Sequence, residues 1–250
     1  MIRVLPLCAL LCISIIVGCK KKSNSSGGGD GGDGGGSVVR TPEHKQEATK
    51  RLRQIARAMH DANDANRFFP AGVVGANGEL GLSWRVAILP QLGQGALYNR
   101  FKLNEPWDSA HNKALIAQMP EVFEAPGVPL GNGKTHLRAF TGPWAFIPPG
   151  PWPKQPAGSL ARGRVTLDIS DGFSNSFMMV EAAEPVEWTK PDDLVFLDQT
   201  SPLPKLGGVF PGGFHVLMCD GSTRFARENI NKQTLRALIT VNGGELPGDW

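Results

Sequence analysis

Apolar residues in the first part of the folded chain recur at steps of three and four positions. They are Ala48, Leu52, Ile55, Ala56, Met59 and Ala62. Lysines and arginines fall between them, so the spacing predicts a helix with one apolar stripe. Thr41, Pro42 and Glu43 are typical of a helix start, with an N-cap residue, a proline at the first helical position and an acid in the first turn. We therefore expect a long amphipathic helix from Thr41 to about Asn66.

Shorter helices are expected behind it. Ser83 can cap one that ends at Pro90. Residues 96–101 form a second, and Asp108 or Ser109 can cap a third. The inward side chains predicted for the third are Ala114, Leu115 and Met119.

Beyond Pro120 the pattern changes to short apolar runs between turn residues, which is typical of strands. The predicted strands are residues 121–123, 136–141, 144–147, 164–169, 177–181 and 195–197. Residues 148–156 are rich in proline and are expected to form a surface loop. A helix followed by strands predicts an α+β fold, in which a long N-terminal helix packs on an antiparallel sheet.

The clearest predicted strand pair is a hairpin, residues 214–219 and 222–225 around the Asp220-Gly221 turn. Alternation assigns its side chains to two faces. One face carries His215, Leu217 and Cys219, and the other carries Val216, Met218 and Asp220. A closing helix follows, with Asn231 or Thr234 as its N-cap.

The extreme N-terminus has the pattern of an exported lipoprotein. Residues 2–18 combine Arg3 with an apolar stretch that is too short to span a bilayer. The stretch ends in Ile16-Val17-Gly18-Cys19, which resembles a lipobox, where the cysteine is lipidated and becomes the new N-terminus. We expect residues 1–18 to be removed and Cys19 to carry the lipid.

Residues 19–40 hold the lipidated cysteine and a tether rich in Lys, Ser and Gly, which cannot bury apolar surface. The domain proper covers residues 41–250. We expect the protein on an extracytoplasmic membrane face of the cell envelope. The outer membrane is preferred, because Lys20 stands where an aspartate retains some lipoproteins at the inner membrane.

Composition narrows the functional classes. The chain has 250 residues, of which 41% are hydrophobic and 20% charged, so it can bury a sizeable core. The formal net charge of +3 is too small and too scattered for a nucleic-acid-binding face. Once the signal is removed and Cys19 is lipidated, Cys219 is the only thiol, so we expect no intrachain disulfide and no structural metal site.

Short motifs along the domain resemble one family. They are Leu52-Arg53-Gln54-Ile55-Ala56, Met59-His60, Phe69-Pro70, Ser83-Trp84-Arg85-Val86, Leu89-Pro90, Pro106-Trp107-Asp108, Asp171-Gly172-Phe173-Ser174-Asn175, Trp188-Thr189-Lys190-Pro191-Asp192-Asp193-Leu194 and Asp220-Gly221-Ser222-Thr223-Arg224-Phe225. Over about residues 52–245 the chain resembles the bacterial domain of unknown function 1559, a prepilin-like family with a His-X9-Asp-Gly motif. The resemblance implies a pilin-like α+β fold and no particular activity.

Two features depart from that family. Its members usually begin with a prepilin signal whose helix runs into the first soluble helix, whereas here a lipobox and a glycine-rich linker take that place. Counting back from Asp220, the family histidine falls on Phe210, and a histidine stands at position 215 instead. The residues of this motif region, whose role the resemblance leaves open, are Phe210, Gly212, Gly213, His215, Asp220 and Gly221.

No catalytic constellation stands out. Gly-x-Ser-x-Gly is absent, Cys219 is interpreted as a small core residue, and His60 is interpreted as a partly buried structural histidine. Paired acids at Asp192-Asp193 and Glu181-Glu184-Glu187 are expected to be solvated or capping. The glycine pairs at 207–208 and 212–213 are expected in turns, since no Gly-Lys-Ser/Thr follows them.

We therefore expect a non-enzymatic structural or interaction module without a cofactor, held at a membrane by its N-terminal lipid. Its expected partner is an envelope protein or a glycan, and not nucleic acid. One alternative is a solute- or glycan-binding protein that uses Trp144 and Trp152 as a stacking surface. Another is a hydrolase with an acidic site, which requires two carboxylates in one cleft.

Overall fold

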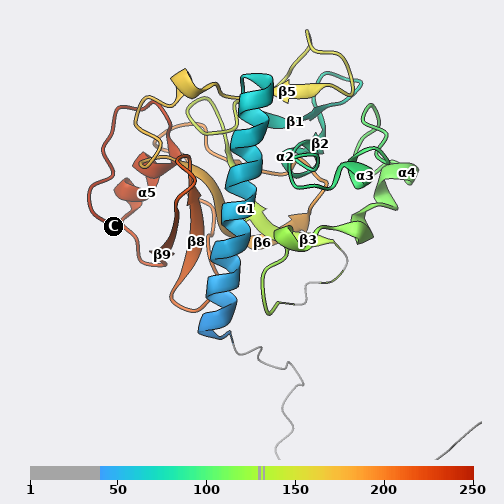
Figure 1. Ribbon diagram of the computed structural model, residues 1–250. Helices are drawn as coiled ribbons and strands as arrows, with labels where there is room; N and C mark the ends of the chain where they lie inside the picture. The colour runs from blue at the N-terminus through green and yellow to red at the C-terminus, as the bar shows by residue number, and fades with distance from the viewer. Residues whose placement is uncertain (1–39, 129–130, 132) are drawn as a thin grey trace, which may run out of the picture. The chain divides into compact units, whose positions relative to one another are not determined.

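Residues 40–128, 131 and 133–250 are described by a computed structural model (Figure 1). The predicted signal peptide, Cys19 and the tether up to residue 39 lie outside the described residues. Within the described ranges, no helix is long and apolar enough to cross a membrane. This part of the chain is an α+β domain with antiparallel sheets and one long helix, as the hydrophobic pattern predicts.

The long helix α1 (Pro42–Asn66) buries the whole predicted apolar stripe. At its start, the Thr41 backbone N–H donates to Nδ1 of His44 at 3.3 Å. At its end, Arg67 takes a left-handed conformation with φ 65°, and its N–H donates to the Asn63 oxygen at 2.6 Å. Both predicted boundaries of this helix are confirmed.

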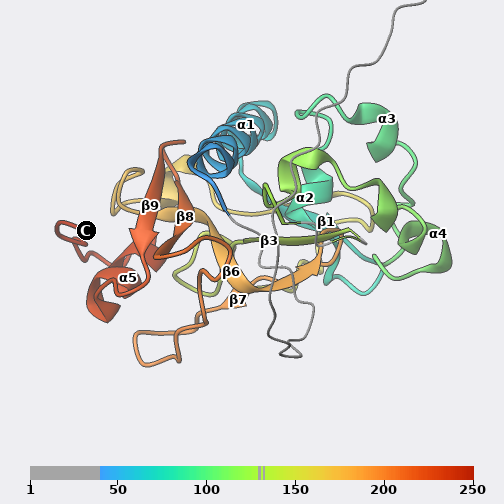
Figure 2. The ribbon, with the colours of Figure 1, turned by 90° about the horizontal axis from the view of Figure 1, so that it is seen from below.

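The main sheet has four antiparallel strands in the order β3-β6-β8-β9. They are β3 (Lys134–Arg138), β6 (Phe177–Glu187), β8 (Gly213–Met218) and β9 (Thr223–Arg227). Strands β8 and β9 form the predicted hairpin, with His215 opposite Phe225. Helix α1 packs against this hairpin (Figure 2).

Strand β8 is buried on both faces, and the predicted alternation of its side chains is confirmed. Leu217 and Cys219 belong to the apolar cluster that contains α1. Val216 and Met218 belong to a second cluster that contains the closing helix α5 (Lys232–Ile239). Figure 2 shows β8 and β9 between α1 and α5. The hairpin is therefore the middle layer of a helix–sheet–helix arrangement.

The remaining helices lie where the pattern predicts them, but they are shorter. They are α2 (Trp84–Ala87), α3 (Gly95–Tyr98), α4 (Ala110–Lys113) and the 3-10 helix η1 (Ile116–Gln118). Ser109 caps α4 and Asn231 caps α5, because each side-chain oxygen accepts a backbone N–H from its helix. The inward position predicted for Ala114 is wrong. Asn112 is buried there instead, since its amide donates to three carbonyls in residues 102–106.

A second antiparallel sheet is missing from the sequence prediction. Its strands are β1 (Pro70–Val74), β2 (Leu80–Ser83) and β5 (Leu160–Arg162), in the order β2-β1-β5. Strand β1 is buried at every position, so it has no alternation to detect. A Cβ on Gly81 would lie 3.1 Å from the Gly75 Cα, so the two chain segments approach each other closely at these glycines.

Some predicted strands are confirmed and others are wrong. Residues 136–141, 177–181 and 195–197 contribute to β3, β4 (Phe140–Thr141), β6 and β7 (Leu194–Val195), of which β4 and β7 pair in parallel. Residues 121–123 are instead the 3-10 helix η2 (Glu121–Phe123), residues 164–169 contain the 3-10 helix η3 (Thr166–Asp168), and residues 144–147 make only an isolated bridge through Ile147. In η3, the Asp168 carboxylate accepts the Val165 N–H at 2.9 Å, a local turn contact that competes with strand pairing.

Trp188 packs at the centre of the larger apolar cluster. Its ring stacks on Phe123 and meets Phe101 edge-on, with centroids 5.8 Å apart in both pairs. Its indole N–H donates to the Ile116 oxygen at 2.9 Å. Trp188 is fully buried, so its ring is shielded from water while its indole N–H keeps a hydrogen-bond partner.

We expect Trp188→Ala to lower the free energy of unfolding by about 3–5 kcal/mol, because it opens a cavity and leaves the Ile116 oxygen without its donor. Urea denaturation followed by circular dichroism measures this. Leu167→Ala is the control, since that side chain is 91% exposed and its loss changes stability by less than about 0.5 kcal/mol. Equal losses in the two variants would contradict the assignment.

Candidate functional site

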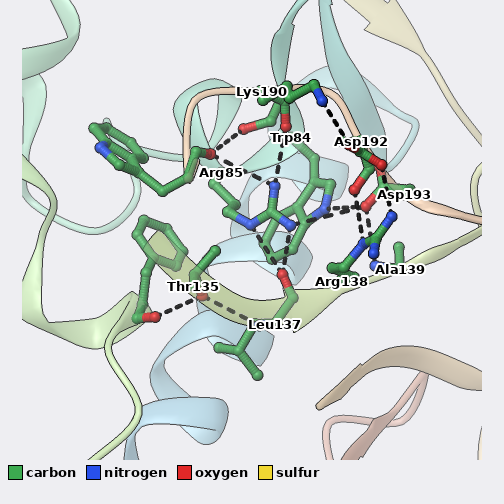
Figure 3. Close-up of polar contacts among 12 residues, drawn as sticks. Trp84, Arg85, Thr135, Leu137, Arg138, Ala139, Lys190, Asp192 and Asp193 are labelled. Atoms are coloured by element: carbon green, nitrogen blue, oxygen red, sulfur yellow. Dashed lines mark hydrogen bonds and ion pairs between the residues drawn. The ribbon is translucent and has the colours of Figure 1, made fainter. Parts of the chain in front are cut away.

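Arg85 lies at the centre of a buried polar cluster where α2, β3 and residues 188–193 meet (Figure 3). Its Nε donates to the Leu137 oxygen at 3.0 Å, and Nη2 donates to the same oxygen. Its Nη1 donates to the oxygens of Trp188 and Lys190 at 3.5 Å each. Each guanidinium nitrogen therefore has a backbone acceptor.

Asp193 supplies the opposite charge to Arg85. Its Oδ1 lies 3.9 Å from Nη2 of Arg85 and accepts hydrogen bonds from Trp84 Nε1 at 3.3 Å and from the Ala139 N–H at 3.1 Å. Burial raises the pKa of Asp193, and burial lowers the pKa of Arg85 to about 10. Loss of solvation outweighs the mutual attraction at both groups, so the surrounding fold holds this ion pair in place.

The neighbouring acid, Asp192, points to different partners. Its carboxylate lies 2.6 Å from Nη2 of Arg138 and 2.8 Å from Nζ of Lys190, and a third of its side chain is exposed. Asp193 turns inward and Asp192 outward, as Figure 3 shows. The two carboxylates do not converge in one cleft, so this pair gives no support to the acidic-hydrolase alternative.

A second buried cluster surrounds His215 on β8. Oε2 of Glu181 accepts hydrogen bonds from the His215 backbone N–H at 2.7 Å and from its Nδ1 at 3.0 Å. The rings of Phe210 and Phe225 meet the imidazole edge-on, with centroids 4.8 and 5.0 Å away. Phe210, where the resemblance places the family histidine, therefore touches the histidine that this chain does have.

A model of the family described as "Protein of unknown function (DUF1559)" matches residues 46–147. Over these residues, the chain matches the DUF1559 family. The resemblance seen in the motifs is confirmed for this part of the chain. No curated protein and no solved structure matches it.

The hairpin lies outside the matched residues, and the motif residues that the sequence places there have a geometrical role. Gly213 begins β8, and a Cβ there would lie 2.0 Å from the Ala226 oxygen. In the turn, Gly221 has φ +81°, and Oδ1 of Asp220 accepts the Ser222 N–H at 2.8 Å. Gly212 likewise has a positive φ, as do both members of the glycine pair at 207–208. Gly212 lies in the turn before the hairpin, as expected, whereas Gly213 begins β8 and residues 207–208 lie in no turn, so the turn expectation is wrong for these three glycines.

Two other motif segments of the DUF1559 resemblance meet inside the domain. Ser83 Oγ donates to the Trp188 oxygen at 2.7 Å, and the Ser83 N–H donates to the Thr189 oxygen at 2.9 Å. Arg85 and Asp193 complete the same junction. Residues 83–86 and 188–194 therefore contact each other in the core. The sequence alone does not indicate this contact, because the two segments are distant in the chain.

The thiol of Cys219 is fully buried. Burial, and to a smaller extent the charge of Asp220, raises the pKa of this thiol well above its ordinary value. Its backbone oxygen lies 2.9 Å from Nε2 of His60. The interpretation of Cys219 as a core residue is confirmed, His60 is half-buried as expected, and a reactive thiolate is disfavoured.

The described residues contain no group of three or more His, Cys, Asp or Glu side chains arranged to hold a metal ion. The predicted tryptophan surface is also divided. Trp152 is half-buried, with its indole N–H donating to the Arg162 oxygen at 2.9 Å. Trp144 is 46% exposed, and its backbone oxygen accepts the Val241 N–H. The Trp152 ring and the Trp144 backbone therefore bond to different segments of the chain.

We expect Asp193→Ala to cost about 3–5 kcal/mol of stability, because it leaves Arg85 buried without a counter-charge. Its neighbour provides the matched control. Asp192→Ala removes a partly exposed ion pair and is expected to cost less than about 1 kcal/mol. Chemical denaturation of both variants compares the two losses, and the reverse order would contradict a buried, structural Arg85 pair.

His136 predicts a pH dependence of stability. It is buried, its Nδ1 lies 2.8 Å from the Ala182 oxygen, and burial lowers its pKa. The unfolded chain binds the proton more readily, so stability present above about pH 6.5 is lost as the pH falls toward the lowered pKa. We expect the wild type to lose more stability than His136→Gln when the pH falls from about 7 to 5. His111→Gln, at an exposed site, should follow the wild type, and a parallel loss in His136→Gln would refute this role.

Proposed function

We propose that this protein is a lipid-anchored interaction module of the bacterial cell envelope, without enzymatic activity. The observation that carries the proposal is the Ile16-Val17-Gly18-Cys19 sequence at the abrupt end of an apolar stretch, followed by the lysines at 20–22 and a glycine-rich linker. Such a sequence attaches a domain to a membrane surface without a spanning helix. The lysines add attraction to acidic headgroups of about 1 kcal/mol each.

The interior of the domain supports a binding role over a catalytic one. Arg85, Asp193, Glu181 and His215 are almost fully excluded from solvent, and each is occupied by partners within the fold. General acid–base chemistry needs such groups within reach of a substrate. Contacts with other molecules therefore fall to the outer surface.

We also propose that the domain is related in fold to pilin-like proteins. The packing of α1 against β8 and β9 supports this relation. The tether would separate the domain from the membrane by roughly 25 Å, the random-coil span of such a linker. The tether then attaches the domain to the outer membrane, and the domain is not incorporated into a fibre through its first helix.

Replacing Cys19 tests the anchor. We expect the full-length chain to incorporate radiolabelled palmitate and to partition into the membrane fraction, and Cys19→Ala to lose the label. Cys12→Ala is the matched control, because that residue leaves with the signal and its variant should be labelled like the wild type. Absence of label in the wild type, or persistence of label in Cys19→Ala, would rule out lipidation at this residue.

A further inference from the structure

Strand β9 forms the end of the main sheet, and it pairs with β8 alone. Two hydrogen bonds set the register at the ends of this pair. The Met218 N–H donates to the Ser222 oxygen at 2.9 Å, and the Glu228 N–H donates to the Gly212 oxygen at 3.2 Å. Because bonded and non-bonded pairs alternate in an antiparallel ladder, Arg224 and Ala226 bond to β8. The backbone groups of Thr223, Phe225 and Arg227 therefore point away from the sheet.

The outer side of β9 is open within the part of the chain that the structure describes. The one bond there is made by the Arg227 oxygen, which accepts the Ile230 N–H at 3.1 Å in the following turn. The N–H groups of Phe225 and Arg227 and the oxygen of Phe225 have no such partner among the described residues. An edge of this kind is a template for another strand.

The opposite edge of the main sheet and both edges of the smaller antiparallel sheet carry contacts to other parts of the fold. Arg85 occupies the Leu137 oxygen on β3. The Gln155 amide bonds to the Arg162 N–H and the Leu160 oxygen on β5. The Trp107 N–H occupies the Gly81 oxygen on β2. Side chains and loops therefore protect β3, β5 and β2, whereas β9 is left available.

An open groove of about 600 Å³ runs beside this edge. Its lining includes Phe225 and Arg227 of β9, Asn229 of the turn, Thr234 of α5, and Asp249 with Trp250. The groove therefore combines free backbone groups with two aromatic rings. This is the combination that β-strand addition uses, with main-chain bonds for affinity and side-chain pockets for specificity.

The charged side chains in the lining of the groove are Arg227 and Asp249, and further cations lie against its two aromatic rings. Lys45 Nζ lies 3.9 Å from the centre of the Phe225 ring, and Arg224 lies over the Trp250 ring at 4.9 Å. With Arg227 these cations outnumber the two acids, Glu228 and Asp249. A second copy paired through β9 would bring the same cations of both chains together. An acidic strand would instead be attracted.

We propose that an extended, acidic segment of a partner protein adds to β9 as a fifth strand of the main sheet. Five residues of such a segment span roughly 17 Å along the strand. This proposal rests on the proposed function as an interaction module and specifies its partner.

The test uses the purified full-length chain and a fluorescein-labelled peptide that alternates valine with glutamate. Arg227→Pro removes one outward N–H while the bonds to β8 remain, because proline is tolerated where the N–H faces away from the sheet. We expect anisotropy titration to show saturable binding that Arg227→Pro weakens ~10-fold or more. Arg227→Ala loses the charge but keeps the N–H, so its effect should be smaller. A peptide that alternates valine with lysine should bind much more weakly.

Hydrogen exchange on the wild type keeps the proposal testable if Arg227→Pro does not fold. The amides of Phe225 and Arg227 should become protected when the acidic peptide binds, while those of Arg224 and Ala226 are protected already. Unchanged exchange, or equal affinity for the lysine peptide, would overturn the proposal. The proposal would also be overturned if the chain sediments as a dimer and Arg227→Pro dissociates that dimer, because the edge would then bind a second copy of the chain. If the peptide does not bind but palmitate labelling persists, the acidic partner is wrong and the anchor stands. If labelling is lost but the peptide still binds, the anchor is wrong and the partner stands.

Discussion

The buried guanidinium of Arg85 is the constraint on which the two sheets depend. An arginine without solvent is tolerated only where its donors meet acceptors and an opposite charge lies near. Leu137 on β3 and Trp188 and Lys190 after β6 supply the acceptors, and Asp193 supplies the charge. Arg85 itself follows β2, so the cluster fixes the smaller sheet against the main one and closes the outer edge of β3.

The other half of the domain is organised by β8, which is buried on both faces. Helix α1 covers one face and α5 the other, so the strand needs apolar side chains at successive positions. His215 is the exception, and it is accommodated because Glu181 accepts both of its nearby N–H groups. The strand beyond it, β9, has exposed side chains and one free edge. Among the described residues, the main sheet is therefore closed at β3 and open at β9.

The motifs that connect this chain with DUF1559 mark positions where the fold allows few alternatives. Gly213 and Gly221 permit the hairpin, and Ser83, Arg85 and Asp193 form the junction of the sheets. These positions hold the architecture together and do not define a contact surface. The proposed lipid anchor suits this division, because attachment through Cys19 would make no demand on the folded part. The family pattern is consequently informative about structure and silent about partners.

The sequence alone determined the elements whose signal is local. Helix α1, the β8–β9 hairpin and α5 follow from side-chain period, capping residues and an Asp-Gly turn, all within a short stretch of chain. The same local signals predicted the lipid attachment at Cys19. Tertiary structure alone decided the strands β1, β2 and β5, because β1 is buried at every position, β2 contains a glycine, and β5 is only three residues long. It also decided that Arg85 meets Asp193 and that Phe210 meets His215. Each of the two sheets joins strands far apart in the chain, and no local period encodes which distant strands will pair.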